Sequence, residues 1–122
     1  MSTREPLELA QDIVTILDKK LAKDIKLIKI SDLTVLADYF VIATGTNSTQ
    51  VKALAAEVEF KLKQEGVTPK NVEGKHPGGW IILDYYSVIV HVFYSETREF
   101  YDLEKLWIDG ETLDISNLLV EE

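Results

Sequence analysis

The sequence predicts a single α/β domain built around a mixed sheet of about five strands, with helices on its faces. Three observations lead to this prediction. Two long segments place apolar residues at helical spacing, and short runs of branched apolar residues lie between and after them. Strands that alternate with helices indicate a layered sheet rather than a helical bundle. The length of 122 residues, 46% of them hydrophobic, suits one domain with one core.

The chain is expected to begin with an amphipathic helix over about 5–22. Its apolar stripe consists of Ala10, Ile13, Val14, Leu17 and Leu21. Two apolar runs, 25–30 and 39–44, follow this helix and predict strands. Only eight residues separate the two runs, which is too few for a helical crossover, so the strands are expected to be antiparallel.

A second helix is predicted after the turn at 45–48, where Thr46 or Asn47 can cap it. Its buried stripe would consist of Val51, Leu54, Ala55, Val58 and Leu62. Gly66 and Pro69 are expected to end it. A short strand is predicted near 71–73. The order strand, helix, strand then requires a parallel, right-handed crossover.

Two further strands are predicted at 80–84 and 87–93, joined by a tight connection near Tyr85 and Tyr86. The second of these runs is apolar on both faces, which is typical of a central strand. Residues 98–107 predict a short helix or two turns.

The end of the chain differs from the rest in composition. Asp109 and Gly110 mark a turn, and an acidic segment with a few apolar residues follows. We therefore divide the chain into an α/β domain at 1–108 and an acidic tail at 109–122. The tail is expected to be docked through Ile115, Leu118 and Leu119 or to be partly mobile.

Composition excludes several classes of function. The chain has no cysteine, which removes disulfides, thiol catalysis and the common zinc sites. Its formal net charge of −8 predicts little direct binding to nucleic acid, because such binding depends on Lys and Arg at phosphates. The charge favours a basic protein partner or serves only solubility, and both readings stay open. No apolar run is long enough to span a membrane, and no signal core opens the chain, so we expect a cytoplasmic protein.

The turn at 45–48 is the first candidate for chemistry, since it joins a strand to a helix N-terminus. It lacks the Lys of a P-loop and the spaced glycines of a dinucleotide site, so helix capping is the favoured interpretation. A metal-dependent nucleotidyltransferase would need two acids at i and i+2 on a following strand. The strand at 80–84 has one acid, Asp84, and its position i−2 is Ile82. We therefore predict no enzyme activity, no cofactor and no metal site.

The two histidines have separate interpretations. His91 alternates with apolar residues, so a core histidine with one hydrogen bond is favoured over a general base. Asp84 could approach His91 across the hairpin, but no third metal ligand is evident. His76 lies in the loop at 75–79, where contact with a partner and ordinary solvation are equally open.

The segment 73–85 is the strongest candidate for a binding surface. Pro77, Gly78 and Gly79 form a turn with little side-chain bulk, and Trp80 follows directly. Tryptophan and tyrosine are enriched at interface hot spots. Trp80 is either folded back to cap the core or exposed as an anchor, and spacing alone does not decide between them. Residues 100–103 form a similar but weaker aromatic cluster.

Three stretches together resemble one known family. They read DYFVIATGTNS at 38–48, VEG through WIILD to VIVHVF at 72–93, and YDLEKLW at 101–107. In this order and spacing they resemble the ribosomal silencing factor family, also called the Iojap-like family, over about residues 5–108. The resemblance implies a nucleotidyltransferase-like α/β fold without its catalytic acids.

The resemblance also implies a function and a site. Members of that family bind the large ribosomal subunit through its protein fourteen, prevent the small subunit from joining, and lower translation when nutrients are scarce. The family's partner-facing tryptophan matches Trp80, and the strand end after it matches Asp84 and Tyr85. The predicted partner-binding residues are Glu73, His76, Trp80, Asp84, Tyr85, Tyr101 and Asp102. Two alternatives stay open: a divergent nucleotidyltransferase or nucleotide-binding protein, and a homodimer that pairs through the same aromatic surface.

Overall fold

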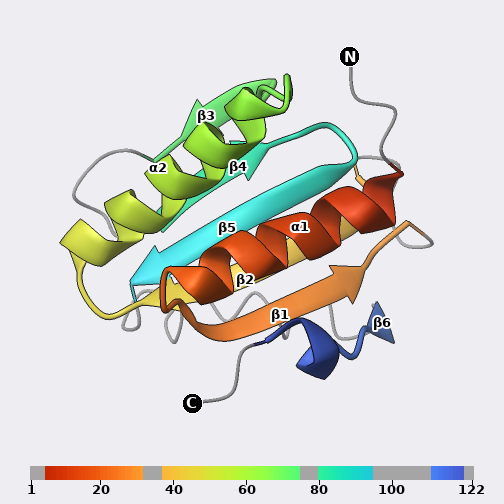
Figure 1. Ribbon diagram of the computed structural model, residues 1–122, viewed down its shortest axis with the longest axis horizontal. Helices are drawn as coiled ribbons and strands as arrows, with labels where there is room; N and C mark the ends of the chain where they lie inside the picture. The colour runs from red at the N-terminus through yellow and green to blue at the C-terminus, as the bar shows by residue number, and fades with distance from the viewer. Residues whose placement is uncertain (1–4, 32–36, 75–79, 95–110, 120–122) are drawn as a thin grey trace.

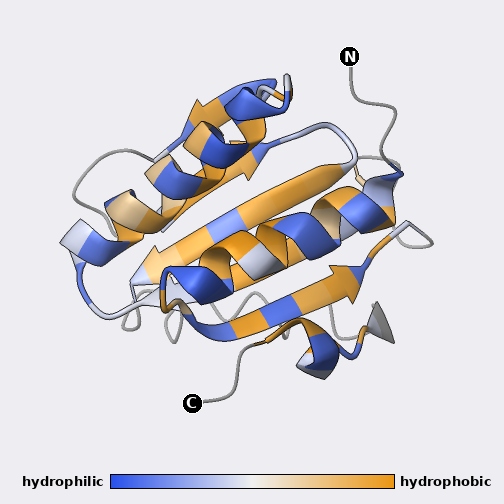
Figure 2. Ribbon diagram, in the orientation of Figure 1, coloured by the Kyte–Doolittle hydropathy of each residue, from blue (hydrophilic) through white to orange (hydrophobic). Residues whose placement is uncertain are grey.

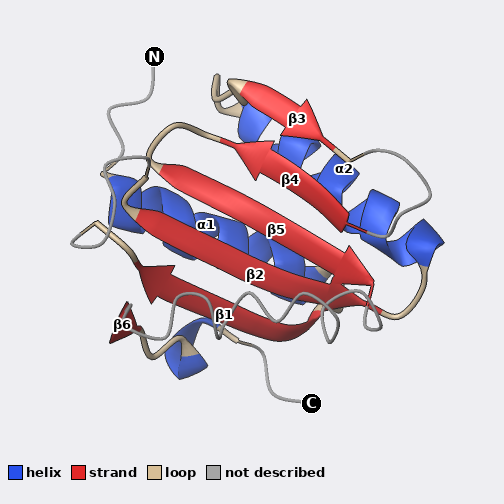
Figure 3. Cartoon of the chain, turned by 180° about the vertical axis from the view of Figure 1, so that it is seen from behind, coloured by secondary structure: helices blue, strands red, loops and turns tan. Residues whose placement is uncertain are grey.

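The computed structural model describes residues 5–31, 37–74, 80–94 and 111–119. Its strands form one mixed sheet in the order β3-β4-β5-β2-β1-β6, in which β6 has only two residues (Figure 1). The predicted sheet of about five strands is confirmed by the five longer strands. The two long helices, α1 and α2, cover one face of this sheet, as the view from behind shows (Figure 3). Within the described residues, both of these helices lie on that one face.

The centre of the sheet is a parallel pair. β2 (Tyr39–Gly45) and β5 (Val88–Tyr94) are paired over their whole length, with Val41 opposite Val90. β5 lies between β4 and β2, so the predicted central strand is confirmed. β1 (Lys23–Lys29) pairs with β2 in the antiparallel sense, also as predicted. β1 begins two residues earlier than the apolar run, and its start is irregular, with a register shift between Lys23 and Lys26 and a φ of 48° at Asp24.

The other edge of the sheet is a small antiparallel unit. β4 (Trp80–Asp84) pairs with β5, and β3 (Asn71–Glu73) pairs with β4. Since each of these pairs is antiparallel, β3 runs in the same direction as β5 and β2. β2, α2 and β3 thus form the predicted crossover between strands of one direction, with β5 and β4 lying between them.

The helix ends follow from local chemistry. α1 (Pro6–Lys19) has proline in its first turn, where no backbone N–H is needed. α2 (Ser48–Gln64) begins after Asn47, whose side chain accepts a hydrogen bond from the Gln50 N–H at 2.8 Å. It ends in a Schellman motif, with Gly66 at a φ of 79°. All five residues predicted for the buried stripe of α2 are buried: Val51, Leu54, Ala55, Val58 and Leu62.

Most of β5 is coloured as hydrophobic (Figure 2), and buried apolar side chains form one cluster on each face of the sheet. The helix-side cluster joins the stripes of α1 and α2 to alternate residues of the strands, among them Val41, Leu83 and Val90. A separate cluster on the opposite face consists of Ile28, Ile30, Ala37, Phe40, Ile42 and Phe93, with Trp80 and Ile89 packed against it.

The C-terminal segment adds the last strand. β6 (Glu111–Thr112) pairs with β1, and a 3₁₀ helix (Ser116–Leu118) follows. Ile115 belongs to the helix-side core, with Leu118 and Leu119 packed against it. These contacts agree with the predicted docking residues. The helix predicted at 98–107 and the turn at 109–110 lie outside the described residues.

Candidate functional site

Three of the predicted site residues lie on one strip of the sheet. Trp80 and Asp84 are the first and last residues of β4, so their side chains point to the same face, away from the helices. Glu73 is paired with Ile82, the residue midway between them, and therefore shares this face. Four residues of strand span about 13 Å. The strip thus places one aromatic ring and two carboxylates along one face of two paired strands, which suits a surface that binds a partner.

Trp80 both covers the core and remains partly exposed. It lies opposite Phe93 on β5, and the two rings are stacked with centroids 4.9 Å apart and planes 26° apart. Its indole Nε1–H donates a hydrogen bond to Nδ1 of His91 at 3.4 Å. The two readings of the sequence, core cap and exposed anchor, each describe part of what the indole does.

His91 is a buried histidine in the middle of this face. Its side chain is 6% exposed, and its ring meets Phe40 edge-on at 4.6 Å between centroids. Burial lowers the pKa of His91 from its ordinary 6.5 to about 4, so the imidazole is neutral at physiological pH. Nε2 has no hydrogen-bond partner among the described residues. The prediction of a core histidine with one hydrogen bond is confirmed.

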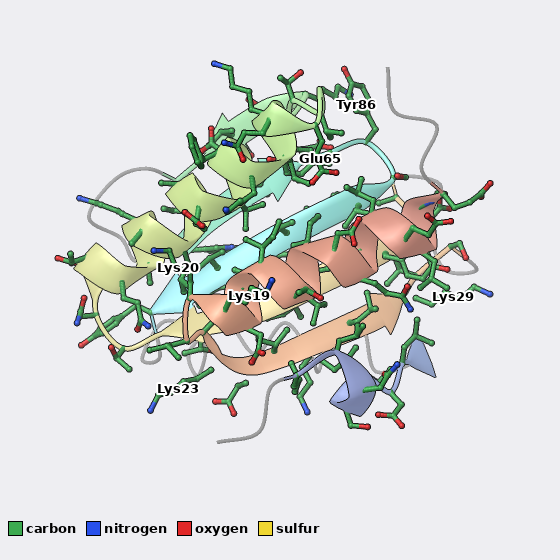
Figure 4. The ribbon with its side chains drawn as sticks, viewed as in Figure 1. Lys19, Lys20, Lys23, Lys29, Glu65 and Tyr86 are labelled. Carbon is green, nitrogen blue, oxygen red and sulfur yellow. The ribbon has the colours of Figure 1, made fainter. Side chains whose placement is uncertain are left out.

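The far end of β4 is shaped by Asp84. Its carboxylate accepts a hydrogen bond from the backbone N–H of Tyr86 at 2.8 Å, which holds the turn to β5. Tyr86 has a φ of 72°, a conformation that bulky residues rarely adopt. Its side chain is 64% exposed, and Nζ of Lys70 lies 5.9 Å from the centre of its ring. Figure 4 shows Tyr86 at the end of the molecule away from Lys20 and Lys23.

Tyr85 requires a correction. It was predicted to contact the partner, but its side chain is 3% exposed and belongs to the helix-side core. It follows Asp84 and points to the opposite face, and burial, with the carboxylate of Glu59 nearby, raises the pKa of its hydroxyl. Its hydroxyl has no hydrogen-bond partner among the described residues. The exposed tyrosine of this pair is Tyr86.

The remaining predicted site residues, His76, Tyr101 and Asp102, lie outside the described residues. Gly74, just before the loop at 75–79, has a φ of 83°. A Cβ at Gly74 would collide with the backbone carbonyl oxygen of Trp80. Glycine is thus required for the chain to pass this close to the strip.

The turn at 45–48 is occupied by its own side chains. Oε1 of Gln50 accepts hydrogen bonds from the backbone N–H and the hydroxyl of Thr46, while Asn47 caps the helix. These contacts agree with the capping interpretation. A Cβ at Gly45 would lie 2.9 Å from Cγ2 of Val51, so glycine here allows α2 to lie close to β2.

The described part of the chain contains no group of three metal-binding side chains. Within the same ranges, no helix is long and apolar enough to cross a membrane.

Comparisons with known proteins agree with one another. A model of the family described as "Ribosomal silencing factor during starvation" matches residues 3–122, and so includes the tail beyond 108. The ribosomal silencing factor of Halalkalibacterium halodurans is 34% identical over 119 residues, covering 98% of this chain and 99% of that protein. The mouse protein "Mitochondrial assembly of ribosomal large subunit protein 1" is 34% identical over 98 residues, covering 78% of this chain and 43% of its own length.

The fold has a counterpart among solved structures. A crystal structure of a protein from Chromobacterium violaceum superposes with a TM-score of 0.83 at 36% identity, and the match covers 93% of each chain. Identity of this level over nearly the whole chain extends the likeness beyond fold alone. The chain belongs to the ribosomal silencing factor family, whose members are ribosome-associated regulators of translation rather than known enzymes.

Proposed function

We propose that this protein binds the large ribosomal subunit through its protein fourteen and so prevents the small subunit from joining. Translation would fall when nutrients are scarce, and the protein would act in the cytoplasm. Membership of the ribosomal silencing factor family is the observation that carries this proposal. The name of the mouse relative, which refers to assembly of the large subunit, favours that subunit as the partner.

The strip on β3 and β4 is the proposed contact surface. Trp80 offers a large, partly exposed aromatic ring, which is the side chain most often found at interface hot spots. The carboxylates of Glu73 and Asp84 lie on the same face and complement a basic partner. We propose that His76, Tyr101 and Asp102 belong to the same contact, whereas Tyr85, being buried, does not.

The proposed action needs no bond to be made or broken. The protein has only to occupy a surface that the subunits require for docking, at a free concentration above its dissociation constant. A net charge of −8 repels ribosomal RNA and attracts a basic ribosomal protein, so it directs the chain to the protein surface.

Subunit joining is the direct test. Purified large and small subunits are mixed with increasing amounts of the protein and separated by sedimentation. We expect joined ribosomes to disappear as the protein saturates the large subunit. Complete joining at saturating protein would show that the proposal is wrong.

Light scattering of the free protein across concentration tells whether it pairs with itself. Such pairing would compete with ribosome binding.

Removal of the aromatic anchor tests the proposed surface. Trp80→Ala should weaken binding to the large subunit by about 2 kcal/mol or more, as at typical hot spots. The matched control is Phe60→Ala, since Phe60 is 56% exposed on α2, on the other side of the sheet. The control should bind like the wild type. Unfolding midpoints of both variants are measured first, and equal weakening by both would argue against the strip.

A further inference from the structure

The indole of Trp80 is held by two neighbours on the adjacent strand. Trp80 is paired with Phe93, so His91 lies diagonally across from it on the same face. Phe93 stacks on the indole, and His91 accepts its N–H. Both neighbours are buried, and they belong to the central strand of the sheet. The anchor of the proposed surface therefore rests on a rigid part of the fold.

The two contacts define different features of the indole. Stacking on Phe93 sets the plane of the ring, but a ring turned over about its χ2 bond keeps nearly the same plane. The hydrogen bond to Nδ1 of His91 distinguishes these two orientations of the indole, because only one orientation brings Nε1–H to the acceptor. The hydrogen bond thus determines which edge of the indole faces away from His91.

The protonation state of His91 suits this task. An indole N–H can only donate, so Nδ1 must carry a lone pair and the proton of the neutral ring must be on Nε2. Burial keeps the ring neutral, and the edge-on contact with Phe40 holds its plane. A charged imidazole would have no acceptor for the indole.

We propose that His91 is a positioning residue for partner binding: its Nδ1 holds the Trp80 indole in the orientation that contacts the partner. The inference rests on the proposed function, because it assigns a supporting residue to the same surface. Its energetic basis is preorganisation, since an anchor already in its bound orientation loses less freedom on binding.

Two substitutions at His91 separate positioning from packing. His91→Asn keeps an acceptor, because its Oδ1 branches from Cγ as Nδ1 does. His91→Leu fills the apolar surroundings with a side chain of similar size and has no acceptor. Val90→Ala is the control for damage to β5, since Val90 is fully buried but points to the helix side.

Two measurements are made on each variant. The first is affinity for purified large subunits. The second is the hydrogen-exchange rate of the Trp80 indole N–H by NMR, with its signal assigned as the one lost in Trp80→Phe. We expect His91→Leu to weaken binding about tenfold and to accelerate indole exchange by a similar factor. His91→Asn should largely restore both, and Val90→Ala should leave both close to the wild type.

The exchange measurement needs no ribosome, so the positioning of Trp80 by His91 and the proposed function are tested separately. If the wild type does not bind large subunits, the proposed function is wrong, and faster exchange in His91→Leu alone still supports the positioning of Trp80. Unchanged exchange and affinity in His91→Leu would overturn the inference. Equal loss in His91→Leu and His91→Asn would overturn it too, because His91 would then act only through its shape.

Discussion

The two faces of the sheet carry different side chains, although the same strands supply both. The helix-side face is almost wholly aliphatic and is covered by α1 and α2. The opposite face carries the rings of Phe40, Phe93 and His91 beside aliphatic residues of β1 and β2, with the partly exposed Trp80 packed against them. Branched aliphatic residues fill a closed core, while rings stack in ordered arrays that can continue to the surface. We infer that stability resides mainly on the helix side and partner contact on the aromatic side.

The largest effect should come from a cavity on the helix side. Leu54 of α2 is 1% exposed and packs in the helix-side core. Leu54→Ala should lower the free energy of unfolding by about 4 kcal/mol, measured by urea denaturation. At a temperature where the variant is still folded, its affinity for the large subunit should match the wild type. Weaker binding by folded Leu54→Ala would contradict the division between the faces.

Low pH should destabilise the protein through His91, which lies on the aromatic side of the sheet. The pKa of His91 is about 4 in the folded protein and near 6.5 when the chain is unfolded. Between these values the unfolded state binds more protons, so stability is highest above pH 6.5 and falls as the pH drops toward 4. At about 1.4 kcal/mol per pKa unit, the full loss is about 3 kcal/mol.

The control for acid is His91→Leu, which has no proton to gain at this position. Urea denaturation at pH 7 and pH 4.5 gives the stability change of each protein, and the carboxylates contribute alike to both. The wild type should therefore lose more stability than the variant. Parallel losses would mean that His91 does not remain neutral in the folded protein.

The sequence predicted local structure well because local structure depends on nearby residues. Apolar spacing identified the buried stripe of α2, and Asn47 was one of two residues expected to cap it. The aromatic cluster could not be predicted this way. Phe40 reaches His91 because β2 pairs with β5, and no short-range pattern carries that pairing.

Two further features, the burial of Tyr85 and the short strand β6, also could not be predicted from local sequence patterns. Tyr85 was expected in the partner contact because the resemblance matched the strand end to Asp84 and Tyr85. Successive side chains point to opposite faces, and the turn after Asp84 determines which tyrosine is covered. β6 is two residues long, which is too short for an alternating pattern to show. Of the predicted site, the strip formed by Glu73, Trp80 and Asp84 is brought together by pairing of β3 with β4.

A smaller effect is expected from the stacking partner of the anchor. Phe93→Leu removes the ring beneath Trp80 and leaves a small gap, which should cost about 1.5 kcal/mol of stability. Because the plane of the indole is no longer defined, affinity for the large subunit should fall as well. The matched variant is Leu83→Ile on the helix side, which keeps volume and should leave binding unchanged. Loss of stability with full affinity in Phe93→Leu would show that stacking is not needed for contact.

The smallest effect should come from the buried tyrosine on the helix side. The hydroxyl of Tyr85 is buried without a hydrogen-bond partner among the described residues, and such a group costs free energy on folding. Tyr85→Phe removes the hydroxyl and keeps the ring, so the free energy of unfolding should stay within about 0.5 kcal/mol of the wild type or rise slightly. Binding to the large subunit should not change, since the ring lies in the core and not on the strip. The neighbouring variant Tyr86→Phe, which alters an exposed hydroxyl, is the control measured by the same denaturation and binding assays. A clear loss of affinity in Tyr85→Phe alone would place the helix side in the partner contact and would end the separation of roles between the two faces.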